Sequence, residues 1–151
     1  VNGIFSINNN KHHEIRTIIN HLTENTKSYQ LIKSVLEDNS KAVYQGKIFV
    51  NPKAQKTDGY QLSKAILLNK DSEFNAKPEL EIYADDVKCS HGSASGSLNE
   101  DSIFYLMSRG LNYQQSRELL INGFLLDVVE KITDPEVKNL IKNMIGIKEW
   151  K

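Results

Sequence analysis

A cysteine and a histidine two residues apart have the clearest capacity for chemistry in this chain. Cys89 is the only cysteine among 151 residues, and His91 is one of four histidines. Side chains at i and i+2 of an extended strand point to the same face, so the thiol and the imidazole are expected to lie side by side. Thiolate and imidazole together can ligate iron or zinc. They can also act as a nucleophile and its base, as in a thiol-dependent hydrolase.

Neither kind of site is complete in the sequence. A closed zinc site needs about four ligands, and His12, His13 and His21 do not lie at a matching spacing. A metal at Cys89 and His91 would therefore need a second chain or an added cofactor. For a hydrolase, the two Cα atoms would be ~6–7 Å apart and no orienting Asn or Asp is evident. A small buried thiol and a strand-end histidine are the plain alternative.

The elements around this pair predict a change from strands to helices. Alternating apolar residues predict a strand that ends near Ala84, after which Asp85 and Asp86 form a turn. Residues 87–91 are expected to form a second strand, and residues 92–96 a Ser-rich connector. Further strands are predicted upstream, at residues 3–7, 14–22, 29–35, 42–50 and 62–68. Such short strands without long helices between them fit a stacked β-solenoid or a β-sandwich.

Three features of the β region are expected to interrupt its strands. Gly46 predicts a bulge or a bend. Asp58 and Gly59 predict a turn within the polar stretch at 54–61, for which a ligand loop is the alternative reading. Residues 69–78 are polar and predict another turn.

His21, next to Leu22, is expected to be a core histidine whose hydrogen bonds are satisfied.

From Asn99 onward the sequence predicts three short helices. Asn99 is a candidate N-cap, Asn112 opens a capping box with Gln115, and Asp134 precedes a proline at the first helical position. Gly110 and Gly146 are expected to end helices. The apolar stripe Ile103, Phe104 and Met107 is predicted to be core, with a cost of ~3–5 kcal/mol for Phe104→Ala. The predicted domains are a β part at 1–97 and a helical subdomain at 98–151.

The composition excludes several classes of protein. Nineteen basic and nineteen acidic side chains cancel, and no basic stripe is present, which argues against a nucleic-acid-binding protein. No apolar run approaches the ~20 residues that span a bilayer, and no secretory signal is visible. A single cysteine fits a reducing compartment such as the cytoplasm. The first residue is Val1, in strand-like sequence, and we expect the chain to be part of a longer protein.

Several blocks of the sequence, in order, resemble the SufB/SufD family of iron–sulfur cluster assembly proteins. The blocks are AQKTDGYQ at 54–61, AILL at 65–68, KPELEIYADDVKCSHG at 77–92 and FYLMSRGL at 104–111. After Ser90 the sequence reads His91-Gly92-Ser93, which resembles the SufD type, whereas SufB-type chains have His-Glu-Ala at these three positions. SufD-type chains commonly read Ala-Thr after that glycine, and Ser93-Ala94 departs from this pattern.

The resemblance implies a mainly β fold, with a right-handed parallel β-helix followed by a small α-helical subdomain. It implies a scaffold that is not an enzyme, pairs with a SufB-like subunit and docks a SufC-like ATPase. Residues 80–91 would lie at the pairing edge, through which a homodimer is also expected in isolation.

The same resemblance implies an iron–sulfur cluster that is transient and shared with the partner. His91 matches a cluster-assembly histidine, and Cys89 matches a family cysteine of less certain role. Both are therefore candidate metal ligands. Phe104, Arg109 and Gly110 are the expected docking residues for the ATPase. Arg109 has an alternative role as a cation at a helix C-terminus. A purely structural β-solenoid interaction module remains the alternative to a cluster scaffold.

Overall fold

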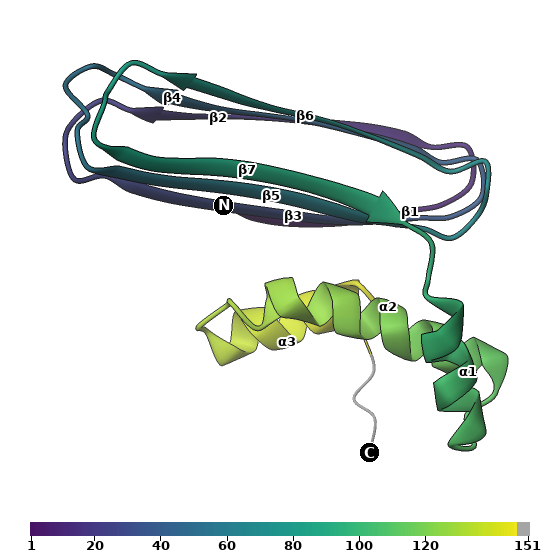
Figure 1. Cartoon of the computed structure of the whole chain (residues 1–151). Helices are drawn as coiled ribbons and strands as arrows, with labels where there is room; N and C mark the ends of the chain where they lie inside the picture. Colours follow the sequence, from purple (N-terminus) through teal and green to yellow (C-terminus); the bar gives the residue numbers. More distant parts are fainter. Residues whose placement is uncertain (148–151) are drawn as a thin grey trace. The chain divides into compact units, whose positions relative to one another are not determined.

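The computed structural model describes residues 1–147, which fall into two compact units that divide between Ser95 and Gly96. The first unit is entirely β and the second is helical (Figure 1). We refer to residues 1–95 as the solenoid and to residues 96–147 as the helical unit. This division into mainly β structure followed by three short helices confirms the predicted fold class.

The solenoid is built from parallel strands that alternate between two facing sheets. Strands β1, β3, β5 and β7 form one sheet in that order, and β2, β4 and β6 form the other. Each strand therefore pairs with the strand two places along the chain, so that the chain winds in stacked coils (Figure 1). The strands are β1 (Asn2–Ile7), β2 (His12–His21), β3 (Lys27–Leu36), β4 (Lys41–Val50), β5 (Thr57–Leu67), β6 (Glu73–Ile82) and β7 (Val87–Gly96).

The structure corrects three predictions about where strands begin and end. Asp58 and Gly59 do not form a turn but lie in β5, and Glu73–Pro78 belongs to β6 rather than to a polar loop. The Ser-rich residues 92–96 continue β7 instead of forming a connector. In each case the ladder with a neighbouring coil imposes an extended backbone on a sequence whose local propensity favours a turn.

Gly46 lies within a continuous ladder and forms no bulge, which is a fourth correction. It pairs with Thr17 on one side and with Pro78 on the other, in unbroken register. Pro78 is tolerated because β6 is an edge strand, where a missing N–H leaves no ladder partner unsatisfied.

Stacked turn residues hold the coils in register at one end of the solenoid. The backbone N–H of Asn9 donates to the carboxylate of Asp38 at 2.9 Å, and the N–H of Asp38 donates to the side-chain oxygen of Asn69 at 2.8 Å. Asn9 and Asp38 both have positive φ, a conformation that Asn and Asp tolerate better than most residues. Hydrogen bonds between Asn and Asp residues thus join three successive turns, and these residue types also tolerate the positive φ that the turns require.

The interior of the solenoid includes apolar clusters and a hydrogen-bonded polar group. One apolar cluster contains Ile7, Leu36, Ala42 and Ala65, and a second contains Ile48, Val50, Ala54 and Ala84. The buried amide of Gln30 donates to Gln61 at 3.3 Å, and Gln61 in turn donates to the carbonyl of Gly46 at 3.1 Å. Tyr44 bonds to Gln30 and to Thr17. These partners satisfy polar side chains whose burial would otherwise be costly.

The helical unit begins and ends its helices where the sequence predicts. Asn99 caps the first helix, Asn112 and Gln115 form a complete capping box, and Asp134 caps the third. Gly110 and Gly146 follow helix ends with φ of 98° and 72°. The helices are α1 (Glu100–Ser108), α2 (Tyr113–Val129) and α3 (Pro135–Met144).

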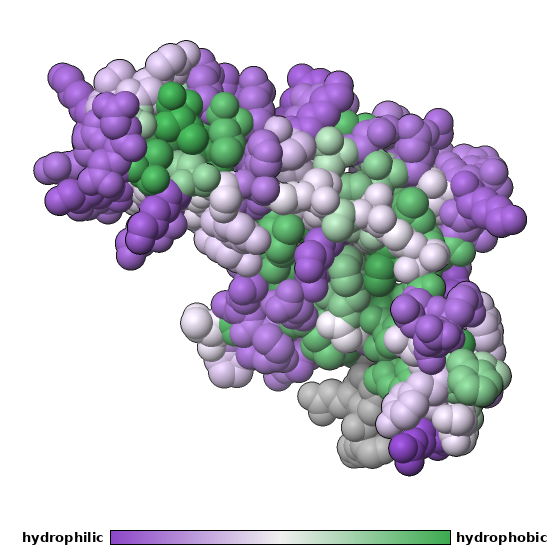
Figure 2. All heavy atoms as spheres, viewed as in Figure 1, coloured by the Kyte–Doolittle hydropathy of each residue, from purple (hydrophilic) through white to green (hydrophobic). Residues whose placement is uncertain are grey.

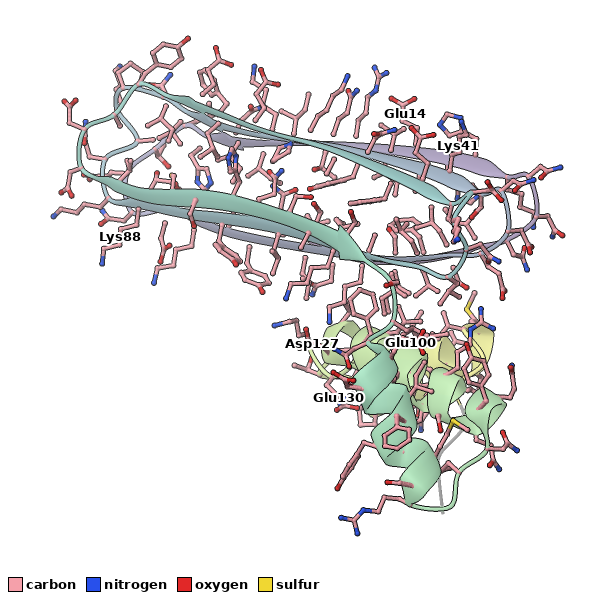
Figure 3. The ribbon with its side chains drawn as sticks, turned by 45° about the vertical axis from the view of Figure 1, so that its right-hand side comes forward. Glu14, Lys41, Lys88, Glu100, Asp127 and Glu130 are labelled. Carbon is pink, nitrogen blue, oxygen red and sulfur yellow. The ribbon has the colours of Figure 1, made fainter. Side chains whose placement is uncertain are left out.

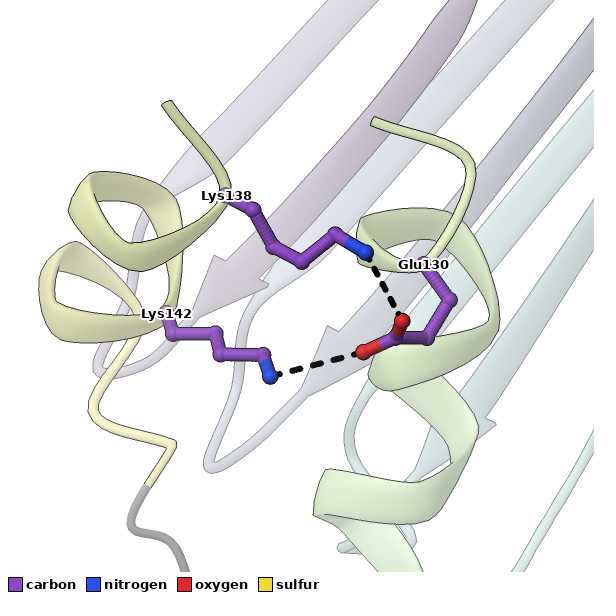
Figure 4. A network of polar contacts seen from close by, with 3 residues as sticks. All are labelled: Glu130, Lys138 and Lys142. Atoms are coloured by element: carbon purple, nitrogen blue, oxygen red, sulfur yellow. Dashed lines mark hydrogen bonds and ion pairs between the residues drawn. The ribbon is translucent and has the colours of Figure 1, made fainter. Parts of the chain in front are cut away.

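One carboxylate ties the end of α2 to α3. Glu130, the C-cap residue of α2, accepts from Lys138 at 2.9 Å and lies 3.4 Å from the ammonium of Lys142 (Figure 4). The two ammonium groups lower the pKa of Glu130, with the hydrogen bond from Lys138 as the largest cause. No helix among residues 1–147 combines the length and the apolar character needed to cross a bilayer.

Candidate functional site

The strand that carries Cys89 and His91 is the last in its sheet. β7 pairs with β5 on one side only, so its other edge has no neighbour among the described residues. The sulfur of Cys89 lies beside Gly59, and Gly92 lies beside Leu62, with the same offset between strands at both points. This offset places His91 next to Gln61 in the ladder, on the side of β7 that faces the interior.

Cys89 is half-buried against the second apolar cluster. Leu80 and Val87 pack against the same cluster. Burial raises the pKa of the Cys89 thiol, the nearby Asp58 carboxylate also raises it, and a backbone hydrogen bond with Gly59 offsets part of the increase. A raised pKa keeps the thiol protonated at neutral pH, the opposite of what a nucleophilic cysteine needs. The geometry thus favours a thiol that binds or packs over one that attacks.

His91 is exposed although its strand position directs it toward the interior. The exposure follows from its place in the terminal coil, where no further coil covers it. The imidazole and the half-buried thiol therefore share one face at the open end of the solenoid, as their spacing predicts. The arrangement offers two soft ligands with room for groups from another molecule.

A complete metal site is absent from residues 1–147. No group of three or more His, Cys, Asp or Glu side chains in that range could hold a metal ion. His12 and His13 are exposed at the start of β2, in the first coil, whereas His91 is in the last. Any metal held by Cys89 and His91 would thus take its remaining ligands from elsewhere.

His21 is a buried histidine with both ring nitrogens satisfied, as the sequence predicts. It is 3% exposed, and its Nδ1 and Nε2 lie 2.7 Å from the Thr26 hydroxyl and 2.9 Å from the Ser28 hydroxyl. Burial lowers the pKa of His21 below its usual value. The neutral imidazole is thus the form that the folded solenoid holds.

This buried imidazole should make the solenoid less stable in mild acid. Below the unfolded-state pKa of about 6.5, His21 binds a proton in the unfolded chain, whereas in the folded chain its lowered pKa keeps it neutral until the pH falls further. The contribution of His21 is therefore complete above that pH and is lost as the pH falls toward the folded-state pKa. His21 adds at most about 1.4 kcal/mol per pH unit to the slope of the unfolding free energy against pH, which is the value for the uptake of one proton.

Urea unfolding at pH 7.5 and 5.5 measures this effect. The variant His21→Gln should lose much of the difference between the two pH values, whereas His13→Gln, at an exposed position, should keep it. Equal pH dependence in wild type and His21→Gln would contradict the assignment.

Of the expected docking residues, Phe104 lies in the middle of α1, and Arg109 and Gly110 lie at its end. The predicted core stripe of this helix is only partly buried. Ile103 is buried at 3% exposure, whereas Phe104 is 75% exposed and Met107 is 43% exposed. The prediction that Phe104 is a core residue, with a large cost of truncation, is therefore wrong for the helical unit as described. The helical period could not distinguish a core face from an apolar face that remains open.

Four large side chains of α1 and the start of α2 are exposed, and we refer to them as the aromatic ridge: Phe104, Tyr105, Met107 and Tyr113. Arg109 is the C-cap of α1, and its guanidinium lies 5.2 Å from the ring centroid of Tyr105. A hollow of about 380 Å³ adjoins the ridge, lined by Asp101, Ser102, Tyr105, Leu106 and Leu120. Large exposed apolar side chains that gather on one surface are typical of protein interaction sites, which makes α1 and the start of α2 a candidate for such a site.

Gly59 is the neighbour of Cys89 that the sequence does not reveal. A Cβ at this position would lie 3.3 Å from the Cys89 sulfur and 3.6 Å from Nε2 of His21. The glycine therefore provides the space in which the thiol lies. Sequence alone predicts a turn at Gly59, and only the register of the strands shows that it lies beside Cys89.

Comparison with known proteins identifies the family of this chain. Residues 1–124 match the profile described as "SUF system FeS cluster assembly, SufBD core domain". The chain is 38% identical over 133 residues to the iron–sulfur cluster assembly protein SufD of Escherichia coli K12, which covers 88% of this chain. It is 40% identical over 119 residues to a chloroplastic protein of Arabidopsis thaliana, ABCI7, which covers 78% of this chain.

The chain is similar to only part of each relative. It spans 31% of the length of the Escherichia coli protein and 25% of the Arabidopsis protein. A SufBD family protein of Synechocystis is 37% identical over 117 residues, which make up 78% of this chain. The chain spans 26% of the length of that protein. The matched region includes the whole solenoid and therefore Cys89 and His91.

Proposed function

Because this chain belongs to the SufBD core-domain family of the SUF iron–sulfur cluster assembly system, we propose that it is a scaffold subunit of that system. The observation that carries the proposal is the open edge of β7, which presents an exposed His91 beside a half-buried Cys89. The scaffold has no catalytic turnover of its own and works in the cytoplasm. Its cargo is an iron–sulfur cluster that it shares transiently with a partner and does not hold in isolation.

The SufB-like partner pairs with this chain through the last coil. The unpaired backbone groups of β7 can continue their ladder with another strand. His91 would then lie at the interface, where ligands from the partner complete the site that Cys89 and His91 cannot make alone. In the absence of the SufB-like subunit, the same edge, residues 80–91, would form a homodimer.

The SufC-like ATPase docks on the helical unit. The aromatic ridge that includes Phe104, together with Arg109 and Gly110 at the end of α1, supports this assignment through its exposed apolar area. We assign the scaffold role to residues 1–97 and the docking role to residues 98–151. ATP hydrolysis by the partner would transmit motion through the docking region.

The alternative of a thiol-dependent hydrolase has less support. The raised pKa of Cys89 argues against an activated nucleophile, and no side chain among residues 1–147 forms a hydrogen bond that would orient His91. No observation specifically favours this activity. A purely structural solenoid module would remain if no partner binds.

The test of the proposal is purification of the chain together with the SufB-like and SufC-like proteins of its own source, with wild-type His91 and with His91→Ala. The proposal predicts a three-protein complex in both cases and a loss of cluster only in the variant. Failure of the wild-type chain to bind either partner would contradict it.

A further inference from the structure

A charged hollow lies at the end of the solenoid opposite the Asn9–Asp38–Asn69 turns. Its volume is about 330 Å³, and residues of three successive coils line it. The lining residues are Lys27, Lys56, Thr57, Asp58, Asp86, Val87 and Lys88. On the face shown in Figure 2, hydrophilic side chains dominate this end of the solenoid around a smaller apolar patch. Figure 3 shows Lys88 projecting outward from the start of β7.

None of the three lysines of the hollow has a carboxylate partner among the described residues, unlike Lys41 and Lys47 in the sheets. Lys41 pairs with Glu73 at 3.0 Å and Lys47 pairs with Glu81. Within the described part of the chain, by contrast, no ion pair involves Lys27, Lys56 or Lys88. Three lysines thus line one hollow without neutralisation by an ion pair.

Lys56 occupies a backbone conformation that its residue type does not favour. Its φ is 59°, and its N–H donates to the carbonyl of Asp86 in the next coil at 2.6 Å. The equivalent residue of the preceding coil is Asn25, with the same φ of 59° and a bond to the carbonyl of Gln55 at 2.9 Å. Asn suits this left-handed conformation, whereas Lys adopts it at a conformational cost. Strain retained at a cavity points to a role for the side chain.

We propose that this hollow binds a small, multiply charged anion of the diphosphate class. The lysines come from successive coils, which are stacked ~4.8 Å apart, so the three positions extend over about 10 Å. Such a row suits an anion with two separated charged groups better than a single phosphate. The volume is near the lower limit of small-molecule pockets, ~300 Å³, which suits a diphosphate group, either free or with a nucleoside that remains outside the hollow.

Two carboxylates limit how strongly the hollow attracts anions. Asp58 and Asp86 line it as well, and no ion pair among the described residues involves either one. They leave a net single positive charge, which opposes nonspecific attraction of extended polyanions. Removal of one carboxylate should therefore strengthen the binding of a diphosphate, and removal of an ammonium should weaken it.

Calorimetric titration of the full chain with inorganic pyrophosphate, at constant ionic strength, tests this inference. We expect saturable binding that Lys56→Asn weakens by about tenfold or more, the typical loss for one charge-assisted hydrogen bond. This variant should not lower the melting temperature, because Asn suits the left-handed conformation. Asp58→Asn should tighten the binding.

Lys70→Gln is the matched control. It removes the same charge from the turn at the opposite end of the coils, next to Asn69. Equal weakening by Lys56→Asn and Lys70→Gln, or no saturable binding by the wild type, would overturn the proposal. Competition by ADP but not by AMP would identify a nucleotide as the source of the diphosphate, and pyrophosphate binding without such competition would identify the free anion.

Discussion

Replacement of Gly46 by alanine is expected to lower the free energy of unfolding of the solenoid by about 3 kcal/mol or more. A Cβ at this position would overlap Nε2 of Gln61 and would lie 2.5 Å from the hydroxyl of Tyr44. Neither neighbour can move away easily. Gln61 is fully buried and bonds to Gln30 and to the carbonyl of Gly46, while Tyr44 is 1% exposed. The methyl group would thus overfill the core and break buried hydrogen bonds.

Thermal unfolding measures this cost, which corresponds to a fall of more than about 10 °C for a unit of this size. Gly96→Ala is the control, because no atom lies within 4 Å of a Cβ at that position. The double variant Gly46→Ala/Gln61→Ala should lose less free energy of unfolding than the two single variants lose in sum, because the shorter side chain at position 61 makes room for the methyl group. If the two losses in free energy of unfolding were additive, the explanation that Gly46 leaves space for the Gln61 side chain would be wrong.

The variant His91→Ala should leave the solenoid folded and the three-protein complex assembled, but should remove most of its iron and sulfide. His91 is exposed and has no side-chain hydrogen bond or ion pair among the described residues, so its truncation costs little stability. As a cluster ligand at the interface, however, it would be essential. We expect at least a tenfold reduction in cluster content, about the lower limit of what the loss of an outer-shell partner costs a metal site.

The control for this prediction is His13→Ala, at an exposed position of β2. Iron and acid-labile sulfide are measured in the purified complex, together with the ratio of the three proteins. Equal cluster content in the wild type, His13→Ala and His91→Ala would contradict the role of His91 and leave the pairing role of β7 intact.

The helical unit could be predicted from the sequence because its signals are local. Asn99, Asn112 and Asp134 each bond to a backbone N–H two or three residues away, so the neighbouring sequence alone specifies the helix starts. The exposure of Phe104 could not be predicted, because it depends on what covers the helix and not on the helix itself.

The strand boundaries could be predicted only in part, because the coils specify one another. Gly59 and Asp58 give a turn signal, yet the ladder with Ser28 and Lys27 extends them. The shared face of Cys89 and His91 follows from the two-residue period of a strand and was predictable. Their position at an open edge was not, since it depends on which strand ends the sheet.

We propose that the last coil, and not the first, meets the SufB-like partner. Site-specific photo-crosslinking tests it directly, with a benzophenone side chain at Ser93 of β7 or at Ile18 of β2, both exposed. In the co-expressed complex, the probe at Ser93 should crosslink to the SufB-like subunit and the probe at Ile18 should not. Crosslinks to that subunit from Ile18 alone would contradict the account, because they would place the partner at the coil farthest from Cys89 and His91.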